Sequence, residues 1–97
     1  MPRYLIEVPH SEDRVACLQV IDIFHKTGSH YLSTCDWGCM DGEHKAWITV
    51  EVDSKADALR ILPPMFRAQA RIVQLCQFSP EMVTAMLAQN APPADCA

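Results

Sequence analysis

Alternation of apolar and polar residues predicts several strands along the chain. The clearest case lies near the start, where Tyr4, Ile6 and Val8 share one face of residues 3–8 and Pro9 ends the run. The same period of two predicts three further strands, over residues 30–37, 45–52 and 71–78.

A helical period follows the first strand. Ser11 is a suitable N-cap, and the helix is expected to run to about Thr27, just before Gly28. Its apolar residues recur at the spacing of a single buried helix face. They are Cys17, Val20, Ile21 and Phe24, with Leu18 beside them.

Caps and prolines mark two further helices. Ser54 begins a helix that the Pro-Pro pair at 63–64 ends, because a residue before proline avoids the helical conformation. Residues 65–69 are expected to form a connector. The Ser-Pro pair at 79–80 begins a short third helix. Residues 91–97 are expected to be a disordered C-terminal tail.

The order of elements is therefore strand-helix-strand-strand-helix-strand, followed by a short helix. This order predicts an α+β protein with a ferredoxin-like fold, in which two helices cover one face of a four-stranded antiparallel sheet. Residues 1–90 are expected to form one domain, since a chain of 97 residues supports a single core.

The size, this order, the opening MPRYLIE and the terminal helix resemble the dimeric α+β barrel superfamily over about residues 3–90. Members of that group include small cofactor-free monooxygenases and muconolactone isomerase-like proteins. The resemblance implies a homodimer that packs sheet against sheet. No catalytic motif of a named member matches residue by residue, so the resemblance assigns no catalytic residue.

The second and third strands form a predicted hairpin around the Asp-Gly pair at 41–42. We expect Trp37 to pair with His44, because this register places opposite charges across the strands and keeps the apolar residues on one face. The face turned toward the helices then carries Tyr31, Cys35, Trp37 and His44. The open face, where a second copy would dock, carries His30, Asp36 and Trp47.

Composition narrows the classes of partner. A net charge of -4 disfavours nucleic acid, and no apolar run reaches the roughly 18 residues that a membrane span requires. The start of the chain has no signal-peptide pattern, so the five cysteines are expected to be reduced thiols in a cytoplasm. Cys17 and Cys76 are interpreted as small apolar core residues, and Cys96 lies in the tail.

Three kinds of chemistry fit the polar residues of the hairpin. Cys35, Cys39 and His44, with Asp41 as a further donor, could hold zinc or another transition metal, although their spacing matches no recognised zinc finger. Cys39 could instead be a nucleophile with His44 as its base. Without either role, these residues are a loop cysteine and a packed histidine.

The third possibility is ligand binding, with acid-base chemistry, in a pocket between the sheet and the helices. Trp37, Cys35 and His10 would line it, and acid-base chemistry would fall to His25, His44 and Tyr31. The alternative is that the aromatic residues belong to the core and that His25 is solvated at a helix end. Three arginines could bind an anion or pair with the chain's own acids: Arg60, Arg67 and Arg71.

The leading hypothesis is therefore a small homodimer that binds a largely apolar molecule, with possible isomerase- or monooxygenase-like chemistry and no cofactor. The alternative is a non-catalytic binding or interaction module, with or without a transition metal held at Cys35, Cys39 and His44. A third hypothesis is that the dimer serves as a subunit of a larger assembly.

Overall fold

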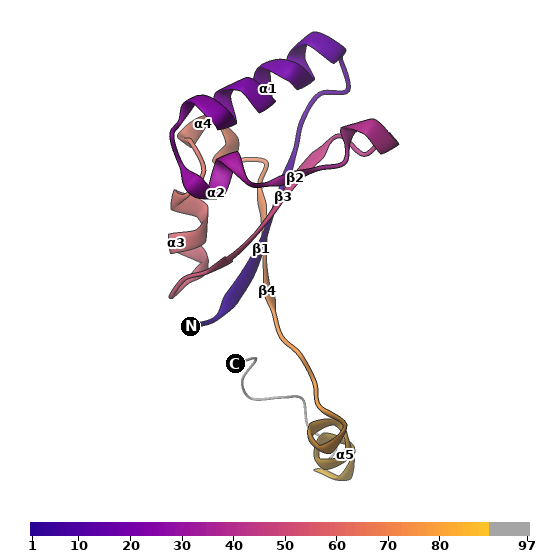
Figure 1. Ribbon diagram of the computed structural model, residues 1–97. Coiled ribbons are helices and arrows are strands. Elements are labelled where there is room, and N and C mark those ends of the chain that lie inside the picture. The colour runs from indigo at the N-terminus through magenta and orange to yellow at the C-terminus, as the bar shows by residue number, and fades with distance from the viewer. Residues whose placement is uncertain (90–97) are drawn as a thin grey trace.

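The first strand lies inside the sheet rather than at its edge. In a computed structural model that describes residues 1–89, β1 (Arg3–Pro9) pairs antiparallel with β3 on one side and with β4 on the other (Figure 1). Tyr4, Ile6 and Val8 are buried, as their alternation predicts. The sheet order is β2-β3-β1-β4, with β2 spanning Asp36–Trp37, β3 spanning Lys45–Glu51 and β4 spanning Arg71–Leu75.

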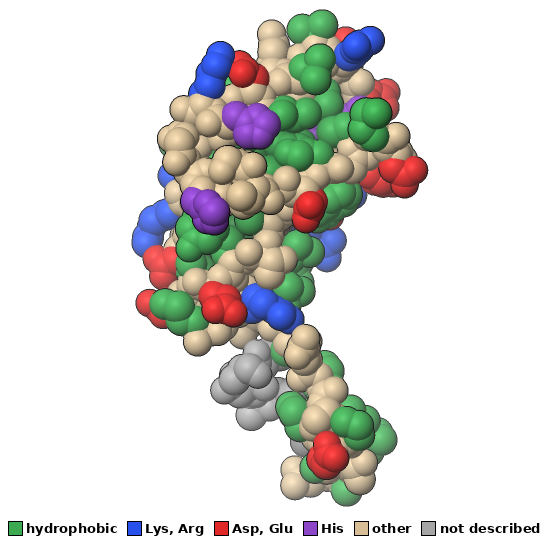
Figure 2. Space-filling view, viewed as in Figure 1, with side chains coloured by type: hydrophobic (Ala, Val, Ile, Leu, Met, Phe, Trp, Pro, Cys, Tyr) green, Lys and Arg blue, Asp and Glu red, His purple; other side chains and the backbone are tan. Residues whose placement is uncertain are grey.

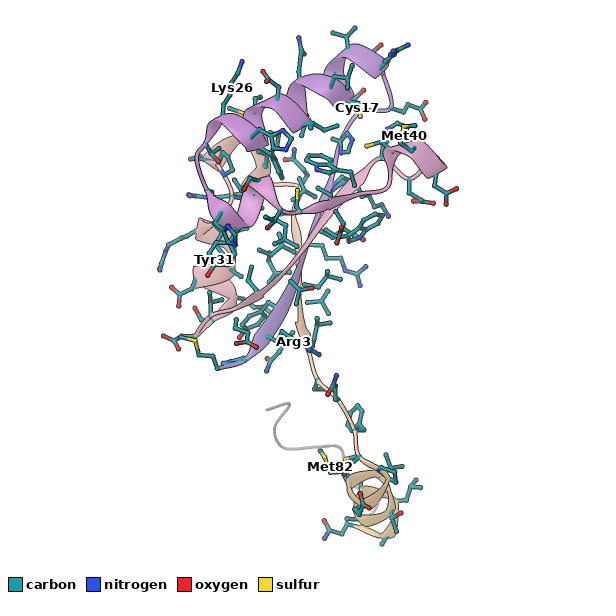
Figure 3. The ribbon with its side chains drawn as sticks, viewed as in Figure 1. Arg3, Cys17, Lys26, Tyr31, Met40 and Met82 are labelled. Carbon is teal, nitrogen blue, oxygen red and sulfur yellow. The ribbon has the colours of Figure 1, made fainter. Side chains whose placement is uncertain are left out.

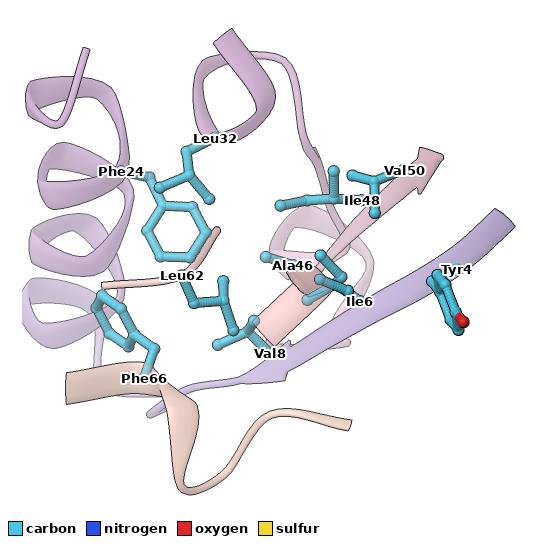
Figure 4. Packing of buried hydrophobic residues seen from close by; sticks show 11 residues of the cluster. Tyr4, Ile6, Val8, Phe24, Leu32, Ala46, Ile48, Val50, Leu62 and Phe66 are labelled. Carbon is cyan, nitrogen blue, oxygen red and sulfur yellow. The ribbon is translucent and has the colours of Figure 1, made fainter. Parts of the chain in front are cut away.

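Helices cover one face of this sheet, so the protein is α+β as predicted (Figure 1). They are α1 (Arg14–Lys26), α2 (His30–Ser33), α3 (Lys55–Arg60) and α4 (Pro64–Arg67). The core forms where Phe24, Leu62 and Phe66 meet the sheet residues Ile6 and Val8 (Figure 4). The rings of Phe24 and Phe66 meet edge to face with centroids 5.1 Å apart, a favoured aromatic geometry.

The strand predicted over residues 30–37 is wrong in its first half. His30–Ser33 form the helical turn α2, and only two residues remain as β2. The turn begins at Ser29, whose hydroxyl oxygen accepts a hydrogen bond from the Leu32 backbone N–H. Helical geometry buries Leu32 in the core and leaves Tyr31 exposed, whereas a strand would have sent Tyr31 under the helices.

The predicted hairpin register is wrong by two residues. Trp37 pairs with Ala46, and Asp36 pairs with Trp47. The connection is longer than the Asp-Gly pair alone suggests, because a 3-10 turn, η1 (Cys39–Asp41), forms within it. A shift of two residues keeps the side chains of β2 and β3 on their expected faces, so Trp37 still packs on the core side.

Helix boundaries also differ from the prediction in two places. The N-cap of α1 is Asp13 rather than Ser11, and its carboxylate accepts a hydrogen bond from the Ala16 N–H at 3.0 Å. Residues 65–69 are not a plain connector. The proline at 64 begins α4, and this turn places Phe66 in the core at 5% exposure.

Two helix N-caps were predicted correctly. Ser54 caps α3 by accepting a hydrogen bond from the Asp57 N–H at 3.1 Å. Ser79 caps α5 (Pro80–Gln89) in the same way. The strand β4 ends at Leu75, three residues earlier than expected.

Helix α5 projects away from the rest of the described chain (Figure 1). None of its residues is buried, and apolar side chains gather on its surface (Figure 2).

The predicted tail, with Cys96, lies outside the described residues. None of the helices described for residues 1–89 combines the length and apolar character of a membrane span.

Candidate metal centre

Four side chains that can each bind a metal come together at one end of the sheet. Their donor atoms, one nitrogen or sulfur from each residue, all lie within 4.8 Å of one another. The residues are His10, Cys17, Cys39 and His44. They come from four different places in the chain: the exit of β1, the helix α1, the turn η1 and the segment just before β3.

Strand pairing brings the two histidines together. Pro9, the last residue of β1, lies opposite Lys45, the first residue of β3. Because the strands are antiparallel neighbours, His10 and His44 continue this pairing by one step. The backbone N–H of His10 donates a hydrogen bond to the carbonyl oxygen of His44 at 3.0 Å. Their rings meet edge to face with centroids 5.7 Å apart.

Local structure fixes the positions of the two cysteines. Cys17 lies in the first turns of α1, and its N–H donates to the carbonyl oxygen of the N-cap Asp13 at 2.8 Å. Cys39 begins η1, whose loop is closed by hydrogen bonds on both sides of Gly38. Gly38 donates to the Lys45 carbonyl at 3.1 Å, and its own carbonyl accepts from the Glu43 N–H at 3.0 Å.

The donor atoms are already close to the spacing of a filled site. The Nε2 atom of His10 lies 3.2 Å from the Cys17 Sγ and 3.1 Å from the Cys39 Sγ. The two sulfurs are 3.3 Å apart. Tetrahedral zinc, with bonds of about 2.3 Å to sulfur and about 2.0 Å to nitrogen, separates a nitrogen–sulfur pair by about 3.5 Å and a sulfur–sulfur pair by about 3.8 Å. These three donor atoms would move apart by a few tenths of an ångström around a bound ion, and all four donor atoms lie within 4.8 Å of one another.

Burial favours the uncharged forms of His10 and Cys39. It lowers the pKa of His10, and the neighbouring His44 lowers it further. Burial also raises the pKa of the Cys39 thiol, with an additional contribution from Cys17. The histidine is thus in the neutral form that binds metal, while the thiol holds its proton until a cation stabilises the thiolate.

Two ring nitrogens of the cluster are left unsatisfied. The Nδ1 atoms of His10 and His44 are buried and have no hydrogen-bond partner among the described residues. A buried polar atom without a partner costs about 1 to 3 kcal/mol. An unsatisfied buried nitrogen of this kind requires an explanation, such as an ordered water or a bound ion.

Trp37 separates the cluster from the core. The His10 ring meets it edge to face at a centroid distance of 5.5 Å. On its other side Trp37 packs against Phe24 at 5.0 Å. Of the four candidate ligands, His10 therefore packs directly against this aromatic pair.

Sequence reasoning found half of this cluster. Cys39 and His44 were predicted as metal ligands and belong to it, but Cys35 does not. The Cys35 thiol donates to the Leu32 carbonyl at 3.3 Å instead, and burial raises its pKa to about 11. The cluster likewise does not include Asp41.

His10 and Cys17 complete the cluster, although the sequence analysis assigned them to a ligand pocket and to the apolar core. The usable signal for His10 was its place at the exit of β1. A residue there must lie beside the start of the antiparallel neighbour β3, and so beside His44.

A cavity of about 510 Å³ opens directly beside the cluster. Cys17, Cys39 and His44 line one side of it, and the remaining lining is mostly apolar. Trp37 and His44 line this cavity, but the predicted acid-base residues Tyr31 and His25 do not. His25 is exposed near the C-terminal end of α1, and Tyr31 is exposed on α2.

The residues predicted for a dimer interface differ in how exposed they are to contact with a second copy. His30 and Asp36 are exposed. Trp47 is partly buried, and its indole N–H donates to the Glu7 carboxylate at 3.0 Å.

The three arginines do not form one site. Arg60 forms an ion pair with Asp57 at 2.6 Å. Arg67 donates to the carbonyl of Leu62 at 3.0 Å. Their charges are thus directed to the chain's own groups, which agrees with the simpler of the two interpretations. Arg71 is exposed at the start of β4.

Comparison of the chain with protein-family models, with curated protein sequences and with solved structures finds no match.

Proposed function

We propose that this protein is a small metal-binding protein that holds one zinc ion through His10, Cys17, Cys39 and His44. The observation that carries this proposal is the convergence of four donor atoms within 4.8 Å of one another from four separate segments. Two cysteines and two histidines are a common donor set for structural zinc.

Charge balance supports a divalent cation at this position. Two thiolates neutralise the two positive charges of Zn²⁺, so the loaded site carries no net charge and leaves no unpaired charge in a partly buried place. The lowered pKa of His10 keeps this ligand neutral near pH 7. A bound ion would also be stabilised by the rigid packing of His10 on Trp37.

The proposed role of the ion is structural. Four protein donors fill a tetrahedral coordination sphere, whereas catalytic zinc keeps one position for water or substrate. The ion would fasten α1 and the loop around η1 to the end of β1. The free energy of metal binding then adds to the free energy of folding.

A ferredoxin-like arrangement and a homodimer remain part of this proposal. The sheet order, with every neighbouring pair antiparallel, supports the first. The homodimer is supported by the exposed apolar side chains of α5, which a second copy of the chain could cover. They include Met82, Val83 and Leu87. Light scattering that gives the mass of one chain would contradict the dimer.

The test is metal analysis of protein purified without a histidine tag. We expect about one zinc per chain in the wild type. Cys39→Ser should reduce the zinc content several-fold, because it removes one of four ligands. Cys35→Ser is the matched control, since Cys35 is a half-buried thiol in the same hairpin that lies outside the cluster.

Cobalt substitution tests the ligand set itself. Thiolate-to-cobalt charge-transfer bands and strong tetrahedral d–d bands are expected in the wild type and in Cys35→Ser, and weaker bands in Cys39→Ser. Equal metal content and equal spectra for the two variants would contradict the proposal, as would wild-type protein that takes up no zinc or cobalt.

A further inference from the structure

We propose that the cavity beside the cluster binds an uncharged, largely apolar small molecule. This inference rests on the proposed function, because the charge on one wall of the cavity depends on the metal. The cavity of about 510 Å³ falls within the range of sites that enclose a small organic ligand.

The cavity lies between α1 and the loop that carries Cys39. Leu18 and Ile21 contribute from the helix, and Met40 contributes from η1. Figure 3 shows Cys17 on the helix and Met40 on the neighbouring turn close to one another. Trp37 closes the cavity toward the core, where it packs on Phe24.

Apolar side chains around the cavity are left without partners. Leu18 is 53% exposed and Met40 is fully exposed, although both line the cavity. Apolar side chains gathered at one concave site are characteristic of ligand-binding surfaces. Leu, Ile, Trp and Met groups would bury the carbon surface of a ligand.

The charges around the cavity argue for an uncharged ligand. Only two ionised side chains line it besides the cluster, Glu12 and Arg14. Their charges cancel, and neither makes an ion pair within residues 1–89. Zinc would cancel the two thiolates of Cys17 and Cys39. The loaded cavity therefore presents no net charge, and a charged molecule would lose hydration without gaining a surplus of opposite charge.

The experiment uses two fluorescent probes of matched shape. N-phenyl-1-naphthylamine is uncharged and apolar, and 8-anilino-1-naphthalenesulfonate is the same ring system with an anionic sulfonate. We expect the uncharged probe to bind zinc-loaded protein with saturation at one site per chain. The anionic probe should bind at least about tenfold more weakly.

Leu18→Glu and Val15→Glu are the variant and its matched control. Both residues are exposed aliphatic side chains on α1, but only Leu18 lines the cavity. Leu18→Glu should lower the affinity for the uncharged probe by at least about tenfold, because it removes an apolar contact in the pocket. Val15→Glu should leave its affinity within about twofold of the wild type. Circular dichroism checks that both variants fold.

The outcomes separate this inference from the proposed function, because zinc content and molecular mass are measured on the same samples. Normal zinc content without saturable binding of the uncharged probe overturns the ligand site alone. The same conclusion follows if both variants lose affinity for this probe equally, or if the protein prefers the anionic probe. Absence of zinc from the wild type overturns the proposed function. If Leu18→Glu halves the molecular mass of a dimer, a second copy covers the cavity and the small-molecule proposal is wrong.

Discussion

The Sγ atoms of Cys17 and Cys39 lie 3.3 Å apart, although the two residues are separated by 22 positions in the sequence. One thiol is fixed by α1 and the other by the turn η1. A disulfide bond has a sulfur–sulfur distance of about 2.05 Å, so a modest movement of the η1 loop would allow the bond to form. The same pair of sulfurs can therefore serve a metal or each other.

We predict that hydrogen peroxide joins Cys17 to Cys39 in metal-free protein. The two thiols lose two protons and two electrons as the sulfur–sulfur bond forms, and the peroxide is reduced to two molecules of water. Peptide mapping should find the 17–39 linkage, with loss of two hydrogen masses. Saturating zinc should slow the reaction several-fold, because the metal holds both thiolates.

Cys35 and Cys76 provide the internal control for this reaction, since neither belongs to the cluster. They should remain unlinked under conditions that convert the cluster pair, and dithiothreitol should restore zinc binding. Random pairing among the four described cysteines, or equal rates with and without zinc, would contradict the prediction.

Gly38 is predicted to be essential for the position of Cys39. A Cβ atom at this residue would lie 2.7 Å from the backbone oxygen of Glu43 and 2.7 Å from the ring of Trp47. Gly38→Ala should therefore displace the loop, weaken zinc binding at least about tenfold and destabilise the fold by about 1 to 3 kcal/mol. Competition with a zinc chelator and urea unfolding measure the two effects.

Gly42→Ala is the matched substitution in the same loop. Its φ of 83° is unfavourable for alanine, but a Cβ there would meet nothing within 4 Å. We expect a stability loss of about 1 kcal/mol from backbone strain and a much smaller change in zinc affinity. Equal zinc affinities for Gly38→Ala and Gly42→Ala would contradict the prediction that Gly38 fixes the position of Cys39.

Phe66 is predicted to be a major contributor to stability, although it lies in a short turn after two prolines. It is 5% exposed and its ring contacts Phe24. Phe66→Ala should lower the free energy of unfolding by about 3 to 5 kcal/mol through loss of buried surface and creation of a cavity. Met65→Ala, next to it and 64% exposed, should change stability by less than about 0.5 kcal/mol. Similar losses in both variants, measured in urea, would show that α4 does not anchor the core.

Cys35 should make stability depend on pH in the alkaline range. Burial, with a smaller contribution from the charge of Asp36, raises its pKa from 9.0 to about 11 in the folded protein. Below about pH 9 the thiol is protonated in both states, so its contribution is constant. Between about pH 9 and about pH 11 the unfolded chain loses this proton while the folded chain keeps it, so the free energy of unfolding falls.

Urea unfolding of the wild type and of Cys35→Ala across this pH range isolates the effect, because all other titrating groups are shared. The wild type should lose more stability than the variant as the pH rises. Parallel curves for the two proteins would contradict the raised pKa.

The sequence predicted those features that depend on neighbouring residues. Alternation along β1 identified Tyr4, Ile6 and Val8 as core residues, and this is confirmed. The caps at Ser54 and Ser79 were also read correctly, since an N-cap is a contact between residues three positions apart. The apolar spacing in the first helix correctly placed Phe24 in the core.

Short segments were decided by tertiary packing. Residues 30–33 have a pattern that fits a strand, but they form a capped helical turn, because this turn buries Leu32 in the core. The turn α4 followed two prolines and carried little local signal, yet its Phe66 fills a space between helix and sheet. For such short pieces the burial of one large side chain exceeds any local preference.

By itself, the sequence determined the class of fold and the residue types available for chemistry, because periodicity and capping act over a few neighbouring positions. Only the tertiary structure decided which of those residues form a site. His10 and Cys17 reach Cys39 and His44 because β1 and β3 pair in one register and α1 folds back over their ends. That meeting of distant segments depends on strand pairing and core packing, which no local pattern encodes.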